Sequence, residues 1–296
     1  MDLEPEKPQP SKFYDGGLPP GEPRPDLPVK VMLERIEKPS GRKQRESFLL
    51  LRRIAYRDDV YGEILVPADP ATFETDFTSV PTLFTWLVPK TGAHLPAALI
   101  HDGMVGAHDY VATGYPPGQD PIDRVAADAI FRRAMRDSMI GPIRQWLVWS
   151  AVTLGTIWGG STAWSTTRHW RYRIAALASI LVVVALGVIA TLDLFDVVAW
   201  LPWMGEGRSF AVELVGGLAG AVVVPLLLGL TWGRFAVAGV VSCVALAVLL
   251  HVTVLLGLIS VAYLGAEWVA RRKPVAMIVL AGVVIAAHLV LVLLFL

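Results

Sequence analysis

Residues of the kinds that catalyse reactions gather in two short stretches of this chain. Residues 74–81 read ETDFTSVP, and residues 97–102 read AALIHD. They form the one part of the chain in which several polar residues of catalytic type stand inside an apolar frame. A further acidic residue, Asp128, follows in a segment with the apolar spacing of a helix. Any chemistry of this chain is therefore expected here.

His101 and Asp128 are the candidates for acid–base chemistry. His101 and Asp102 are neighbours on an expected helix, so their side chains point about 100° apart and each needs another partner. Asp128, on a later helix, is suited to accept a hydrogen bond from His101 and to fix the tautomer of its ring. An orienting carboxylate does this for a catalytic base. In this interpretation His101 is the base and Asp128 positions it.

Two other carboxylates are candidates for binding a metal ion. Asp76 and Asp102 offer oxygen ligands, which a hard cation such as Ca²⁺ prefers. Ser79, close to Asp76 in the sequence, is a candidate hydrogen-bond donor behind such a site, or alternatively a nucleophile. A cation-assisted reaction at His101 is one hypothesis that these residues support.

Each of these residues also has a purely structural interpretation. Asp76 is able to cap the turn that follows it through its side chain. Asp128 has Arg124 and Arg132 four residues before and after it, so a surface ion pair worth about 0.3 kcal/mol would explain it. His101 fits a core histidine bonded to a backbone carbonyl. The sequence therefore predicts a buried polar network and leaves open whether it is structural or catalytic.

The segments that must position these residues are of mixed type. Residues 29–69 contain three short runs of strand-forming residues separated by polar turns, which is typical of a short antiparallel meander. Pro96 suits the first turn of a helix that continues through His101. A second helix follows a Gly/Pro loop and ends near Gly141. We therefore expect an α+β domain over residues 29–145.

The segments on either side of this domain differ from it. Residues 1–28 contain eight prolines and few apolar residues, so we expect a disordered, proline-rich tail. Residues 146–173 are rich in tryptophan, with intermittent Gly, Ser and Thr. This composition is typical of a helix at a membrane interface or of a connecting helix.

The last 123 residues have the composition of a membrane region. They hold only ten of the 52 charged residues of the chain. Four apolar segments, at residues 174–192, 210–232, 235–266 and 275–296, are each long enough to cross a hydrocarbon core of about 30 Å. We therefore expect an all-α transmembrane region of about four helices over residues 174–296. The chain is predicted to be an integral, multi-pass membrane protein in contact with the lipid bilayer.

The charges that flank the spans predict an orientation. Three arginines precede the first span, and the loop after it is acidic, so the positive-inside rule places the N-terminal domain in the cytoplasm. Residues 271–273, which read RRK, would then follow a third crossing and lie outside. A further crossing by residues 146–164 would return these basic residues to the cytoplasmic side. The number of spans, four or five, therefore stays open.

Net charge and cysteine content exclude two classes of partner and site. The formal net charge is zero, so no nucleic-acid partner is expected. The single cysteine, Cys243, lies in an apolar segment. An intrachain disulfide is therefore impossible, and a cysteine-based metal site is not expected.

Four motifs of the N-terminal domain resemble the DUF1353 family, a domain of unknown function found in bacteria and tailed phages. In order, they are VPA at residues 66–68, TDFTSVP at 75–81, AALIHD at 97–102 and RVAAD at 124–128. The resemblance covers about residues 30–155 and implies a phage-related chain, but no activity. The first functional interpretation is therefore a module that binds a protein partner, or forms a homo-oligomer, at the membrane.

A weaker, local resemblance is to the phospholipases A2, in which a helix carrying His-Asp faces a second helix carrying an Asp. This resemblance implies His101 as the base that activates water, Asp102 as a Ca²⁺ ligand and Asp128 as the orienting carboxylate. The disulfides of that family have no counterpart in a chain with one cysteine. The second functional interpretation is thus a metal-assisted hydrolase acting on lipid. The sequence leaves open whether the chain is an enzyme.

Overall fold

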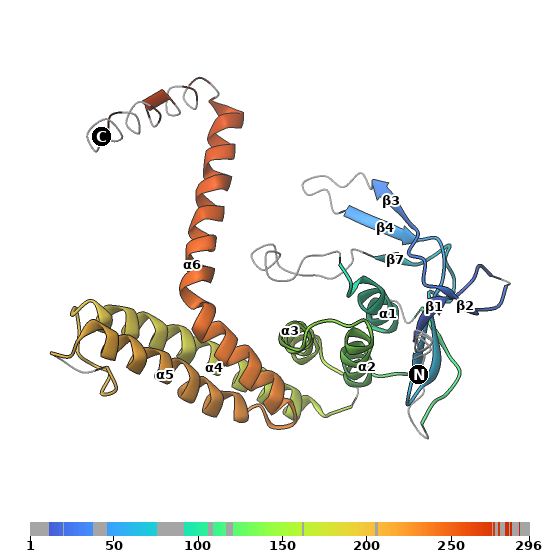
Figure 1. Cartoon of the computed structure of the whole chain (residues 1–296), viewed down its shortest axis with the longest axis horizontal. Coiled ribbons are helices and arrows are strands. Elements are labelled where there is room, and N and C mark those ends of the chain that lie inside the picture. The colour runs from blue at the N-terminus through green and yellow to red at the C-terminus, as the bar shows by residue number, and fades with distance from the viewer. Residues whose placement is uncertain are drawn as a thin grey trace, which may run out of the picture. The chain divides into compact units, whose positions relative to one another are not determined.

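A computed structural model describes most of the chain (Figure 1). The described residues are 12–19, 21–37, 46–75, 92–105, 109–116, 121–161, 163–204 and 207–273, with single positions beyond residue 273. The chain forms two compact units, Met1–Val248 and Leu249–Leu296. The first unit contains the N-terminal sheets, five helices and the beginning of a sixth.

Two antiparallel sheets form the β part of the first unit (Figure 1). The strands are β1 (Phe13–Asp15), β2 (Arg24–Pro28), β3 (Leu33–Glu37), β4 (Glu46–Leu50), β5 (Ile54–Asp58), β6 (Gly62–Val66), β7 (Glu74–Thr75) and β8 (Val111–Ala112). One sheet has the order β2-β1-β5-β6-β8, and the other has the order β3-β4-β7. Hairpins join β3 to β4 and β5 to β6. The expected α+β class is confirmed, although two sheets replace a single meander.

The described part of the N-terminal segment is ordered, so the expectation of a disordered tail over residues 1–28 was wrong there. β1 pairs with β5 inside the five-stranded sheet, and Phe13 and Tyr14 are buried. The buried carboxylate of Asp15 pairs with Arg52 and accepts the N–H of Gly17 at 3.0 Å. Strand pairing and a buried ion pair offset the ordering entropy of this segment. Neither contribution is visible in the proline content.

Three helices complete the N-terminal part: α1 (Leu95–Val105), α2 (Arg124–Asp137) and α3 (Pro142–Gly159). Asp123 caps α2, because its carboxylate accepts the N–H of Ala126 at 2.7 Å. The apolar face of α2, which includes Ile130 and Phe131, is fully buried in the same core as Leu99 of α1. This core fixes the two helices that carry His101 and Asp128.

Residues 146–173, expected as one connecting or interfacial helix, belong to two helices instead. α3 ends at Gly159, and α4 begins at Thr166. Gly160, with φ at 86°, takes a left-handed conformation that favours glycine, and the helix ends there. Val148 of α3 packs in the domain core, whereas Ile157 packs in a second core that includes Trp232. α3 is thus a packed helix that contributes to both cores.

Three described helices are long and apolar enough to cross a membrane. They are α4 (Thr166–Leu194), α5 (Phe210–Leu230) and the segment Gly233–Arg272, in which a 3-10 turn (Gly233–Phe235) leads into α6 (Ala236–Arg272). Only 17%, 11% and 6% of their most apolar windows are buried inside the protein. These helices match three of the four expected spans. The fourth, at residues 275–296, lies outside the described residues apart from single positions.

Candidate functional site

His101 and Asp128 meet where α1 packs against α2. Nε2 of His101 lies 2.9 Å from Oδ1 of Asp128. The His101 side chain is 15% exposed and the Asp128 side chain is 4% exposed, so a buried carboxylate contacts a ring that is mostly buried. The ring of Phe131 lies 5.0 Å from the imidazole, centroid to centroid. Two residues that the sequence singled out therefore form one contact.

Gly103 sets the distance between α1 and the sheet. A Cβ at this position would lie 2.5 Å from Cγ1 and 2.9 Å from Cγ2 of Val66 in β6. Real Cβ atoms do not approach other carbons so closely, so only glycine allows α1 to lie this near β6. Because His101 stands two residues before Gly103, the same packing fixes where the imidazole meets α2.

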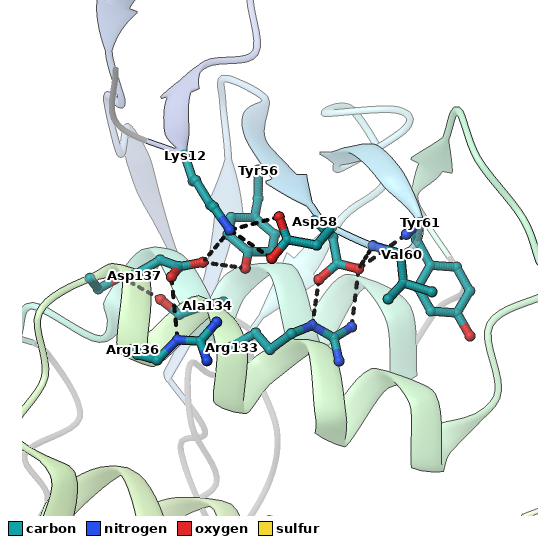
Figure 2. Close-up of polar contacts among 11 residues, drawn as sticks. Lys12, Tyr56, Asp58, Val60, Tyr61, Arg133, Ala134, Arg136 and Asp137 are labelled. Carbon is teal, nitrogen blue, oxygen red and sulfur yellow. Dashed lines mark hydrogen bonds and ion pairs between the residues drawn. The ribbon is translucent and has the colours of Figure 1, made fainter. Parts of the chain in front are cut away.

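An ion pair between Asp58 and Arg133 fixes α2 against β5 (Figure 2). Arg133 donates from Nε at 2.8 Å and from Nη2 at 3.0 Å. The same carboxylate accepts the N–H of Val60 at 3.0 Å and of Tyr61 at 3.1 Å. The Asp58 side chain is fully buried. A buried carboxylate with four donors is well satisfied, and this pair therefore holds the helix that carries Asp128 in place.

A second set of contacts lies at the C-terminal end of α2 (Figure 2). Tyr56 donates to Oδ2 of Asp137 at 2.8 Å, and Lys12 donates to Asp59 at 2.9 Å. Nζ of Lys12 also lies 3.4 Å from Asp137. Burial raises the pKa of Tyr56, and its hydrogen bond to Asp137 raises that pKa further. The phenol therefore stays protonated and donates. From the sequence, residues 57–59 are expected only as a turn, because no local pattern shows which distant residue pairs with them.

Of the two interpretations left open for Asp128, the surface ion pair with Arg124 or Arg132 was wrong. Asp128 is 3% exposed, and its carboxylate contacts His101. Arg132 lies instead over the ring of Trp146, 4.6 Å from its centroid. The guanidinium of Arg124 lies against Gly159 of α3, where an added Cβ would collide with Nη1. Both arginines therefore contact aromatic or backbone surfaces of α3 and not the carboxylate.

The other candidate residues give a partial picture. Asp102 follows His101 on α1 and is partly buried. Asp76 and Ser79 lie outside the described residues, so their placement stays a prediction. Within the described ranges, no group of three or more His, Cys, Asp or Glu side chains is placed to hold a metal ion. A Ca²⁺ site at Asp76 and Asp102 therefore also stays a prediction.

The contact between His101 and Asp128 has a definite chemical capability. A carboxylate that accepts the Nε2–H of an imidazole fixes the tautomer and leaves Nδ1 with a lone pair. That nitrogen is then the one able to take a proton from water or a substrate. Oδ2 of Asp128 is buried without a hydrogen-bond partner in the described part of the chain. The contact is thus compatible with a base held by a carboxylate, and equally with a buried structural pair.

Comparison with known proteins places this pair inside a family domain. Residues 48–152 match the model of a family described as a protein of unknown function, DUF1353. The matched range contains α1 and α2. No curated protein matches the chain, and no solved structure matches it. Residues 48–152 are therefore similar to the DUF1353 family, and His101 and Asp128 lie within the matched range.

Proposed function

We propose that this chain is a multi-pass membrane protein that holds its DUF1353 domain at the cytoplasmic surface of the bilayer. The observation that carries this proposal is the exposed apolar surface of three long helices. Leu181 of α4, Leu227 of α5 and Leu258 of α6 are 59%, 58% and 63% exposed. Removing such apolar surface from water is favourable by about 25 cal/mol per Å². A hydrocarbon core of about 30 Å would cover them.

Flanking charges support the cytoplasmic placement of the domain. Arg168, Arg171 and Arg173 stand near the start of α4, whereas Asp193 and Asp196 stand at its end. The positive-inside rule then places the start of α4, and the domain before it, in the cytoplasm. The basic residues 271–273 stand at the end of α6, whose last turn includes Arg271 and Arg272. The 37 residues of α6 span about 55 Å at 1.5 Å per residue, so they extend beyond one straight crossing.

Cysteine accessibility tests the topology because the chain has one natural cysteine, Cys243. In a Cys243→Ala background, single cysteines replace Met139 of the domain, which is 91% exposed, and Val197 after α4, which is 65% exposed. A membrane-impermeant maleimide should label Val197→Cys in intact cells, and Met139→Cys only after permeabilisation. Labelling of Met139→Cys in intact cells would contradict the orientation. Release of the chain by alkaline carbonate would contradict membrane insertion.

Within the domain, the geometry favours a hydrolytic function at His101. The supporting observation is the 2.9 Å contact between Nε2 of His101 and Oδ1 of Asp128. With Asp128 holding the ring, Nδ1 takes a proton from water, and the hydroxide attacks an ester or amide carbonyl presented at the membrane surface. The proton then passes from the imidazolium to the leaving group. A lipid or another membrane-proximal molecule is the substrate class that this placement favours.

The alternative is a domain that only binds a protein partner or another copy of this chain. An assay of ester hydrolysis distinguishes the two functions. The full chain in nanodiscs is tested against a panel of lipid and soluble esters, as wild type, His101→Gln and Asp128→Asn. A base and its positioning carboxylate predict that turnover falls by about 10²-fold or more in both variants. Amide exchange in α1 and α2 should stay close to that of the wild type.

Asp137→Asn is the matched control, because Asp137 is also an acid on α2 that bonds a side chain, Tyr56. It should retain turnover. Equal turnover in wild type and His101→Gln, or loss of α1 and α2 protection without any reaction in the wild type, would instead support a structural pair in a partner-binding domain. A phage-related role, which the DUF1353 resemblance implies, is compatible with either function and predicts no different effect of these substitutions.

A further inference from the structure

Arginine and aromatic side chains gather at one end of the hairpin that α4 and α5 form. We call this group the arginine–aromatic cluster. It consists of Trp164, Tyr172, Phe235, Arg168, Arg171 and Arg234. None of these residues belongs to the site formed by His101 and Asp128. The cluster lies where the apolar helices begin, and its chemistry points to a ligand of its own.

The start of α4 lies beside the end of α5. The rings of Tyr172 and Phe235 are 5.1 Å apart, centroid to centroid. About two helical turns further along α4, the indole N–H of Trp232 donates to Ser179 at 3.1 Å. Because α4 and α5 run in opposite directions, arginines that are distant in the sequence share one end of the hairpin. Arg168 and Arg171 come from α4, and Arg234 follows α5.

Aromatic rings give this end a firm platform. Trp164 meets Tyr172 edge to face at 5.7 Å and Phe235 at 5.6 Å, centroid to centroid. The guanidinium carbon of Arg234 lies 5.6 Å from the centroid of Trp164. A cation held over an indole face loses little further freedom when it binds an anion. The platform therefore presents Arg234 in a restricted position.

The positive charge at this end is not balanced by carboxylates. Arg168, Arg171 and Arg234 are exposed, and in the described ranges none of them forms an ion pair with an acidic side chain. The acidic residues of the hairpin stand at its other end, with Asp193 near the end of α4 and Glu213 near the start of α5. The cluster is therefore a site of positive potential next to an apolar surface.

The neighbouring tryptophans fit the headgroup level of a membrane. Trp158, near the end of α3, is 50% exposed, and Trp170 of α4 is 57% exposed. Arg173 connects them, because its guanidinium lies 5.3 Å from the centroid of Trp170 and donates to the carbonyl of Trp158. Exposed tryptophans collect at the boundary between headgroups and acyl chains. A water-soluble anion would explain the arginines but not these rings.

We propose that the arginine–aromatic cluster binds the phosphate groups of anionic phospholipids. The inference rests on the proposed function, because it requires that α4 and α5 cross a bilayer. Guanidinium groups match phosphate oxygens with paired N–H donors, and the exposed rings of Trp158 and Trp170 would lie among the adjoining acyl chains. Bound lipid would hold the start of α4 at the membrane surface. Since Arg173 links α4 to α3, it would also hold the DUF1353 domain near that surface.

The test uses the purified full chain in dodecyl maltoside micelles. Its melting temperature, followed by tryptophan fluorescence, is measured against added dioctanoyl-phosphatidylglycerol, dioctanoyl-phosphatidylcholine and inorganic phosphate. We expect a rise that saturates with phosphatidylglycerol alone, because a ligand that binds only the folded state stabilises it. An equal rise with phosphatidylcholine would overturn the proposal. An equal rise with inorganic phosphate would also overturn it, in favour of a site for a free anion.

Variants locate the binding. Arg234→Gln should weaken the apparent affinity for phosphatidylglycerol about fivefold, as expected for one basic residue at an anionic surface. Arg168→Gln with Arg171→Gln should weaken it about 25-fold, and this pair leaves the aromatic rings in place. Arg208→Gln is the matched control, because Arg208 is an exposed arginine beside the start of α5. An equal loss in the control would overturn the proposal.

Failure of this inference is distinguishable from failure of the proposed function. A chain that resists carbonate extraction but responds equally to both lipids spans the membrane without an anionic lipid site. A chain that carbonate releases does not span the membrane at all. The first result removes only the lipid site, whereas the second removes the proposed topology on which it depends.

Discussion

Asp58 and Arg133 connect the five-stranded sheet to α2 through two charge-assisted hydrogen bonds, of 2.8 and 3.0 Å. The carboxylate is fully buried, and the guanidinium side chain is 23% exposed. Arg133 lies on α2, the helix that carries Asp128, about one turn beyond that residue, whereas Asp58 ends β5. It therefore controls where the candidate site can form, although neither residue belongs to that site.

Removal of Arg133 should destabilise the domain strongly. Arg133→Met leaves a buried carboxylate with only backbone donors, and the loss of one partner of such a pair costs about 3 kcal/mol. Amide exchange of β5 and α2 peptides in the full chain should rise accordingly. Arg136→Met is the control, because the Arg136 side chain is 61% exposed and lies 3.6 Å from Asp137. Similar exchange in the two variants would contradict the buried pair.

Asp15 should make the stability of the N-terminal sheet depend on pH. The hydrogen bonds of Arg52 hold the pKa of Asp15 below its usual 3.8, although burial raises it. The folded state therefore binds this proton less readily than the unfolded chain, and the stabilisation is present above about pH 3.8. It is lost as the pH falls through the lowered pKa. Wild type and Asp15→Asn should accordingly differ in β1 exchange at pH 6 and converge in acid. A constant difference would contradict this linkage.

Gly103→Ala should disturb both the packing of α1 and the candidate site. The added Cβ would meet Val66 at 2.5 Å, and overpacking of this kind costs about 1–3 kcal/mol. We expect a lower melting temperature and faster exchange in α1. Val66→Ala removes the two methyl groups involved, so the double variant should recover part of the loss. A double variant that is less stable than the sum of the single ones would contradict this account.

Gly229→Ala should weaken the packing of α5 against α6. An added Cβ would collide with the backbone N of Val240, and a Cβ on Gly239 would lie 2.5 Å from the carbonyl oxygen of Gly229. Backbone atoms cannot move aside as a flexible side chain can, and small residues allow such close helix contacts in membranes. Gly257→Ala is the control, because a Cβ there meets nothing within 4 Å. In a titration with a denaturing detergent, only Gly229→Ala should unfold at a lower detergent concentration than the wild type.

A Ca²⁺ site at Asp102 predicts a metal-dependent melting temperature. The full chain should melt higher with Ca²⁺ than without it, and Asp102→Asn should lose that rise, because a bound cation stabilises only the folded state. Mg²⁺ and Zn²⁺ serve as controls for selectivity. The absence of a shift with any of the three ions would leave His101 and Asp128 to act without a cation.

Some features of this protein follow from the sequence by itself. Three of the four predicted apolar helices are confirmed among the described residues. They could be predicted because a span depends only on local length and composition: about 20 apolar residues match the hydrocarbon core wherever they occur. The α+β class of the N-terminal part followed from local periodicity for the same reason. His101 and Asp128 were selected because polar residues inside apolar segments need partners.

Other features were decided only by the tertiary structure. His101 and Asp128 are 27 residues apart, and the packing of α1 on α2 brings them together. Asp58 and Arg133 are 75 residues apart, and nothing near either residue indicates the other. The recruitment of β1 from a proline-rich segment depends in the same way on β5 and Arg52. Pairing energies between distant segments arise only once the chain has closed the loops between them, so local patterns do not contain them.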